Sequence, residues 1–174
     1  MDKCEGVIIL KLNTMRNPEK IKIFLVDDDP MFVTMLKHSL ARDKAEIKIF
    51  GNGEECLKSI DEAPEIVVLD YSLNNTLNGI QVLNKIKHSH PDTKVIMLSG
   101  QDNFEVINDT IKYGGYDYIA KSESAVFKIQ KEVKQLCDEL ESTRELEKEN
   151  KKILLINVAV IVVIITAYIL SRLI

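Results

Sequence analysis

Polar side chains that could perform phosphoryl chemistry stand at the ends of four apolar runs in this 174-residue chain. In chain order, Asp27 and Asp28 follow the run 21–26, Asp70 follows 66–69, Ser99 follows 95–98 and Lys121 follows 118–120. Apolar runs that alternate with helical patterns predict a parallel sheet, and such a sheet gathers the carboxyl ends of its strands at one edge. We therefore expect three carboxylates, a hydroxyl and an ammonium group to meet in one pocket.

The predicted pocket favours a hard divalent cation. Carboxylates crowded together repel one another unless a cation lies between them, and oxygen ligands with room for water suit Mg²⁺. Phosphoryl transfer requires positioning and charge neutralisation, so one carboxylate would attack phosphorus in line while Mg²⁺ and Lys121 balance the charge of the phosphoryl oxygens. Ser99 would then donate its hydroxyl to a phosphoryl oxygen.

From Lys20 to about Leu140 these residues resemble the receiver domain of two-component response regulators. The resemblance implies that Asp27 and Asp28 hold Mg²⁺, with Asp29 an additional acid, and that Asp70 is the phosphoacceptor. It assigns the remaining roles as follows: Ser99 and Lys121 contact the phosphoryl group, Gly100 leaves space for it, Tyr118 is the aromatic switch, and the backbone carbonyl of Ser72 is a further metal ligand.

Two segments depart from the family pattern. The segment 71–79 lacks the usual proline and carries about one extra residue before Gly79, which predicts a longer and looser loop beside the acceptor. Ser122 stands where the family has a proline after the lysine. A cis bond to a non-proline residue costs ~3 kcal/mol, so we expect no cis bond there and a less rigidly aimed Lys121.

The predicted fold is α/β, a flavodoxin-like doubly wound five-stranded parallel sheet of (βα)5 type, whose ligand crevice lies outside the carboxyl strand ends. The expected strands are 21–26, 46–50, 66–69, 94–98 and 117–120, and the expected helices are 31–41, 54–60, 79–88, 104–113 and one from 125 onward. About 120 residues bury one adequate core, and no room remains for a second domain.

The composition argues against a nucleic-acid partner. The formal net charge is −4, both signs are scattered without a basic stripe, and no helix-turn-helix segment follows the receiver. Three cysteines show no metal spacing, which suits a reducing cytosol. The histidines lie away from the predicted strand ends, so none is a candidate phosphoryl carrier.

The segment 153–170 is uncharged and almost wholly apolar. Extended to Ile174 it reaches ~30 Å as a helix, enough to cross a bilayer. A buried core helix is the alternative, but a chain of this length offers no protein to cover a helix that is apolar on every side. The lysines precede the segment (Lys148, Lys151 and Lys152) and Arg172 alone follows it, which predicts a tail-anchored, single-pass protein of the cell (inner) membrane with its receiver in the cytoplasm.

Four segments are expected: an N-terminal extension 1–19, with Met15 as an alternative start, the receiver 20–140, a charged helical stalk 141–152 and a transmembrane helix 153–174. The spacing of Val126, Ile129, Val133 and Leu136 is typical of a core face. The stalk has too few good heptads to predict a coiled coil, so a homodimer stays open.

The sequence thus predicts a membrane-tethered single-domain response regulator that accepts a phosphoryl group on Asp70 from a histidine kinase or histidine phosphotransfer protein. Its output would be a changed surface for a protein partner, and self-phosphorylation and self-dephosphorylation would be its only chemistry. One alternative is a pseudo-receiver that binds partners without phosphorylation. Another is an Mg²⁺-dependent phosphohydrolase with the spacing of Asp27 and Asp29, although Asp70 would then lack a role.

Overall fold

The computed structural model describes residues 20–41, 44–74, 76–100 and 104–173; the predicted N-terminal extension, Met15 included, lies outside them. The strands are β1 (Ile21–Val26), β2 (Ala45–Phe50), β3 (Ile66–Asp70), β4 (Lys94–Ser99) and β5 (Asp117–Ala120). The helices are α1 (Pro30–Leu40), α2 (Gly53–Lys58), α3 (Gly79–Ser89), α4 (Phe104–Lys112) and α5 (Ala125–Leu173), with a 3₁₀ turn, η1 (Ile60–Glu62), after α2. The second helix was expected to continue to residue 60, but it ends at Lys58 and the chain tightens into η1.

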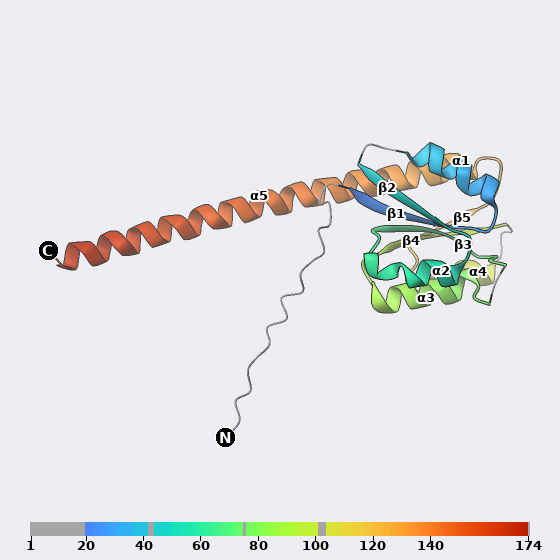
Figure 1. Cartoon of the computed structure of the whole chain (residues 1–174), viewed down its shortest axis with the longest axis horizontal. Helices are drawn as coiled ribbons and strands as arrows, with labels where there is room; N and C mark the ends of the chain where they lie inside the picture. The colour runs from blue at the N-terminus through green and yellow to red at the C-terminus, as the bar shows by residue number, and fades with distance from the viewer. Residues whose placement is uncertain (1–19, 42–43, 75, 101–103, 174) are drawn as a thin grey trace, which may run out of the picture.

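The five strands form one parallel sheet in the order β2-β1-β3-β4-β5. Figure 1 shows α1 and α5 on one face of the sheet and α2, α3 and α4 on the other. Because helices cover both faces of the sheet, β3 is buried at every position, and its residues before Asp70 are all apolar. The doubly wound fold predicted from the sequence is confirmed.

Each face of the sheet packs on its own apolar core. On one face, inward side chains of the strands meet α1 at Leu36 and α5 at Ile129 and Val133, all nearly inaccessible to solvent. On the other face, α2 and α3 bury Cys56 and Leu83 against alternate strand residues. The two cores hold the sheet rigidly, and the carboxyl ends of its strands are thereby fixed relative to one another.

Helix α5 is a single continuous helix of 49 residues, or ~73 Å at 1.5 Å per residue. Its first turns pack on the sheet, whereas every residue from Glu145 to Arg172 is exposed, and Figure 1 shows the helix running far beyond the domain. By length and composition it is a candidate membrane span. The predicted borders between receiver, stalk and span at 140 and 152 coincide with no break in the backbone.

Candidate functional site

The turn from β1 into α1 carries three consecutive acids with different surroundings. Asp27 is 3% exposed, and its Oδ1 accepts a hydrogen bond from the backbone N–H of Asp29 at 2.9 Å. Asp29 is exposed, and its side chain caps α1 by accepting from the N–H groups of Met31 and Phe32. Asp29 is therefore engaged as a helix cap, whereas Asp27 is buried at the edge of the sheet.

Asp70 ends β3 in the middle of the sheet and is also 3% exposed. The first residue of α3, Gly79, packs directly on its backbone: a Cβ on Gly79 would lie 2.4 Å from the Asp70 carbonyl oxygen and 2.7 Å from Tyr71 Cα. The Gly79 N–H donates to the Tyr71 carbonyl at 2.9 Å. Asn78 starts α3 with a capping box, so hydrogen bonds fix the point at which the loop after Asp70 enters the helix.

Lys121 joins the two buried carboxylates. Its Nζ lies 2.7 Å from Asp27 Oδ2 and 3.0 Å from Asp70 Oδ2, and 5.0 Å from the centroid of the Phe32 ring. Its backbone N–H donates to the Ser99 carbonyl at 2.7 Å. No peptide bond between described residues is cis, as expected with Ser122 after the lysine. Lys121 contacts both acids without a cis bond after it.

The acids form one cluster that fits a hard cation. Ligand oxygens of Asp27, Asp28 and Asp70 lie within 4.8 Å of one another. Asp28 is half-buried, and its Oδ2 accepts a hydrogen bond from the Asn74 side-chain amide. Asp70 Oδ1 is buried and has no hydrogen-bond partner among the described residues. Three carboxylates against one ammonium leave an excess of negative charge and a free oxygen ligand, which fits Mg²⁺, a hard cation that prefers oxygen ligands.

The pKa values of Asp70 and Lys121 reflect two opposing effects, burial and the attraction between their charges. Burial raises the pKa of Asp70; the hydrogen bond and charge of Lys121 oppose the rise, the charge of Asp27 adds to it, and the backbone of Ser72 lowers it. Burial by itself would lower the pKa of Lys121, but hydrogen bonds to Asp27 and Asp70 and their charges raise it overall. The two acids therefore favour the charged form of Lys121, while burial disfavours the charged form of Asp70.

The remaining predicted residues lie around this cluster. Ser99 ends β4 and is 3% exposed, next to exposed Gly100, where an added Cβ would meet nothing within 4 Å. Ser72 is exposed in the loop after Asp70. Tyr118 is half-buried and packs against the core on the α2, α3 and α4 face. The roles assigned to these four residues stay predictions.

Sequence reasoning missed three contacts of the site. Asn74, in the lengthened loop, bonds to Asp28, Phe32 covers the Lys121 ammonium, and Gly79 supports the Asp70 backbone. The helix start at Gly79 was predicted, and the capping-box pattern from Asn78 to Gln81 supports it, but its contact with the Asp70 backbone was not foreseen. No sequence signal points to the other two contacts.

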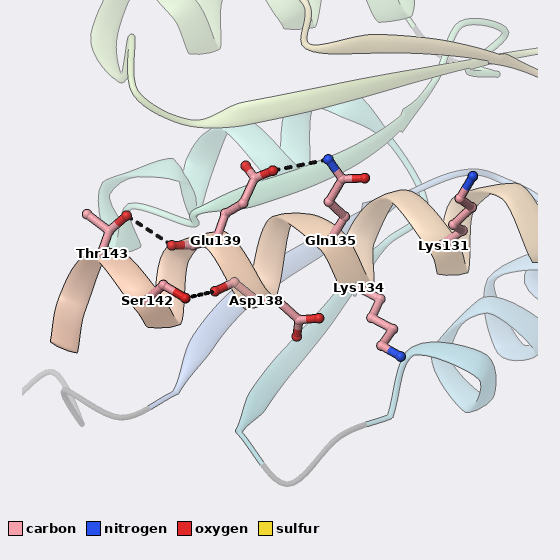
Figure 2. Close-up of a pocket in the computed structure, with 7 residues that line it drawn as sticks. All are labelled: Lys131, Lys134, Gln135, Asp138, Glu139, Ser142 and Thr143. Atoms are coloured by element: carbon pink, nitrogen blue, oxygen red, sulfur yellow. Dashed lines mark hydrogen bonds between the residues drawn. The ribbon is translucent and has the colours of Figure 1, made fainter. Parts of the chain in front are cut away.

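A large surface hollow lies away from these acids, on α5. Figure 2 shows its lining side chains spread along the outside of one helix. They are engaged locally, since Gln135 donates to Glu139 and the Ser142 and Thr143 hydroxyls donate to backbone carbonyls one turn earlier. No ligand groups converge there, so the acidic cluster is the better candidate site.

Comparisons with known proteins agree with this geometry. The family model described as the response regulator receiver domain matches residues 23–134. The chemotaxis protein CheY of Listeria monocytogenes is 34% identical over 103 residues, which cover 58% of this chain and 86% of that protein. The BeF3-activated DrrB receiver domain of Thermotoga maritima superposes with a TM-score of 0.62 at 28% identity, covering 68% of this chain and 98% of that one.

Other relatives are longer. The probable transcriptional regulatory protein SgaR of Hyphomicrobium methylovorum is 32% identical over 107 residues, which are 60% of this chain and 50% of that protein. The match to a putative NtrX-like response regulator of Rickettsia conorii, 32% identical, covers 59% of this chain and 22% of that protein. The chain thus spans half or less of these two relatives, and what they share with it is the receiver. The chain belongs to the response regulator receiver domain family of two-component signalling.

Proposed function

We propose that Asp70 accepts a phosphoryl group from a phosphohistidine of a histidine kinase or phosphotransfer protein. One Asp70 oxygen forms a bond to phosphorus as the bond from phosphorus to the histidine nitrogen breaks, which leaves an acyl phosphate. The observation that carries this proposal is the Lys121 ammonium, held within 3.0 Å of both Asp27 and Asp70 beside an unbonded Asp70 oxygen.

The acidic residues around Asp70 and the residues that would contact the phosphoryl group have different roles. Asp27, Asp28, Asp70 and the Ser72 carbonyl would hold Mg²⁺, which supplies neutralisation of the phosphoryl charge when bound. Lys121 would neutralise a phosphoryl oxygen from the β5 side, and Ser99 would donate its hydroxyl to another. Tyr118 would change its packing when Asp70 is phosphorylated. Output by such a signalling module is a changed surface, which a protein partner reads.

The same chain would be tethered to a membrane by the apolar part of α5. The helix is exposed on every side from Glu145 onward, and no described segment covers it. Apolar side chains exposed to water are unfavourable, whereas a bilayer solvates them, and an α-helix can enter it because its backbone hydrogen bonds are made within the helix. The basic residues before the span would keep the receiver in the cytoplasm, where phosphodonors and Mg²⁺ occur.

The decisive experiment is phosphorylation of the chain by a small acyl phosphate, with and without Mg²⁺. We expect an Mg²⁺-dependent, base-labile phosphate that is lost in Asp70→Asn and retained in Asp61→Asn, a matched change at an exposed acid of η1. Asp27→Ala combined with Asp28→Ala should remove the Mg²⁺ dependence together with the phosphate. Absence of phosphate on the parent chain under all conditions would favour the pseudo-receiver, and undiminished label in Asp70→Asn would show that the acceptor is another residue.

A further inference from the structure

The end of the domain opposite the acidic cluster is rich in exposed lysines. Because α1 to α4 each return from the carboxyl ends of the strands, their last turns all lie at the amino-terminal edge of the sheet. Each last turn is basic, and the residues are Lys37 and His38, Lys58, Lys87 and His88, and Lys112. Lys44, just before β2, adds another exposed lysine. We call Lys37, Lys44, Lys58 and Lys112 the basal lysines.

A basic last turn is ordinary on its own, because it complements the helix dipole. Exposed acids also occur at this end, at Asp61 and Asp92, and on α5 beyond it Glu145, Glu147 and Glu149 are matched in number by Lys148, Lys151 and Lys152. Others are engaged: Glu65 accepts from the Arg144 guanidinium at 2.7 Å and from the Lys22 backbone N–H at 2.8 Å. The other end of the domain, which carries the acidic cluster, is negatively charged: it holds the three clustered carboxylates and the acidic first turns of α2 and α4.

Helix α5 leaves the domain through this same basal end (Figure 1). Glu141 pairs with Lys44 at 3.1 Å, and Arg144 pairs with Glu65, the residue before β3. Residue 144 is therefore level with the beginnings of the strands. The apolar segment starts nine residues later, at Ile153, which is ~14 Å along an unbroken helix.

That spacing brings the basal lysines close to a membrane surface. The headgroup region on one side of a bilayer is roughly 5–7 Å thick. The remaining gap of roughly 7 Å is about one Debye length at physiological salt, so charges on the two surfaces interact. An anionic surface attracts the basal end and repels the acidic end, and the continuous helix fixes the same orientation.

We propose that the basal lysines contact anionic lipid headgroups of the membrane that α5 crosses, an inference that rests on the proposed span. The carboxylate edge then faces away from the bilayer. Asp70 lies five residues along the strand direction from Glu65, or ~16 Å further out, at ~30 Å from the hydrocarbon boundary. A phosphodonor would reach it from the aqueous side and not along the membrane plane.

The test compares the full chain in nanodiscs of phosphatidylcholine with the chain in nanodiscs of equal parts phosphatidylcholine and phosphatidylglycerol. Lysines are modified with an amine-reactive reagent and quantified by mass spectrometry. We expect labelling of the basal lysines to fall severalfold in the anionic discs and to recover at high salt. Lys128, exposed in the first turn of α5 at the opposite end, serves as the internal control and should label equally in both discs.

Matched charge variants separate lipid contact from a general effect of charge. Lys37→Gln with Lys58→Gln and Lys112→Gln should reduce the protection of Lys44, because three of the four charges that attract the anionic surface are gone. The control set, Lys128→Gln with Lys131→Gln and Lys134→Gln, removes the same charge from exposed positions of α5 and should leave that protection intact.

The outcomes distinguish this inference from the proposed span. A chain that fails to co-purify with either disc refutes the span, and the lipid contact with it. A chain that co-purifies but whose Lys44 labels equally in both discs refutes the lipid contact and leaves the span standing. Equal loss of protection in the two variant sets also refutes contact at the basal end.

Discussion

Replacing Lys121 with methionine tests the electrostatics of the site most directly. The change keeps a long side chain against Phe32 but leaves the carboxylates of Asp27 and Asp70 buried without their shared cation. At 2.7 and 3.0 Å, with an effective dielectric constant of ~20, each contact has a gross attraction of ~6 kcal/mol, much of which offsets desolvation. Removing one partner of a buried pair costs about 3–5 kcal/mol. The Lys121 side chain is 23% exposed, so we expect the low end of that range.

A loss of ~3 kcal/mol in the free energy of unfolding is about two powers of ten in the folding equilibrium. It should depend on pH. Burial already raises the pKa of Asp70, and loss of the ammonium raises it further. A carboxyl whose folded-state pKa is raised destabilises the fold above that pKa, and the penalty disappears as pH falls to the unfolded value near 3.8. The deficit of Lys121→Met should therefore be largest at neutral pH and shrink in acid.

The assay is urea unfolding of the chain ended at Glu149, followed by far-ultraviolet circular dichroism because the sequence contains no tryptophan. Lys128→Met, at an exposed position, is the control and should unfold like the parent. Mg²⁺ should restore part of the stability of Lys121→Met, because a divalent cation can replace the lost ammonium between the acids. If Lys121→Met and Lys128→Met were equally stable at neutral pH, and neither responded to pH or Mg²⁺, the bridge would have no energetic role.

Three further predictions follow from the same site. Asp70→Asn should be more stable than the parent at pH 7 without Mg²⁺, because it removes a charge whose pKa burial raises, and this gain should vanish as pH falls to 3.8; a gain that persists in acid would point to packing instead. Gly79→Ala should cost about 1–3 kcal/mol and slow phosphorylation, because its Cβ would overlap the Asp70 backbone, whereas Gly51→Ala, with open space around it, should match the parent in both assays. The chain ended at Glu149 should stay in the aqueous phase and still be phosphorylated, while the full chain should sediment with membranes; a full chain recovered in the soluble fraction would refute the tether.

The fold was predictable because its central strands are covered on both faces. β3 is buried at every position, and β1 and β4 are buried at all but one, which produces apolar runs broken only by Lys22 in β1 and preceded by Lys94 in β4. A polar residue at the end of such a run has few alternatives to the carboxyl edge of the sheet. The convergence of Asp27, Asp70 and Lys121 then follows from the parallel arrangement, and the structure brings them within hydrogen-bond distance.

The contacts that escaped prediction depend on the path of a loop or on the rotation of a helix. Asn74 lies in the irregular segment after β3, and its side-chain amide donates to Asp28. Phe32 faces Lys121 because of where α1 starts after its cap at Asp29. Neither of these two contacts produces a periodic sequence pattern, so residue spacing could not predict them.

The continuity of α5 shows why a change in composition need not be a change in structure. The segment 141–152 differs sharply in charge from its neighbours, but it contains strong helix formers, and no glycine or proline occurs between Ala125 and Leu173. The change in composition therefore marks a change of surroundings along one helix. Because Ile129 and Val133 of that helix belong to the receiver core, the receiver cannot turn about the proposed span without disrupting its own packing. Under the proposed function, the anchor and the phosphoacceptor are therefore joined by one continuous helix, and a partner would approach Asp70 in the orientation that the membrane imposes.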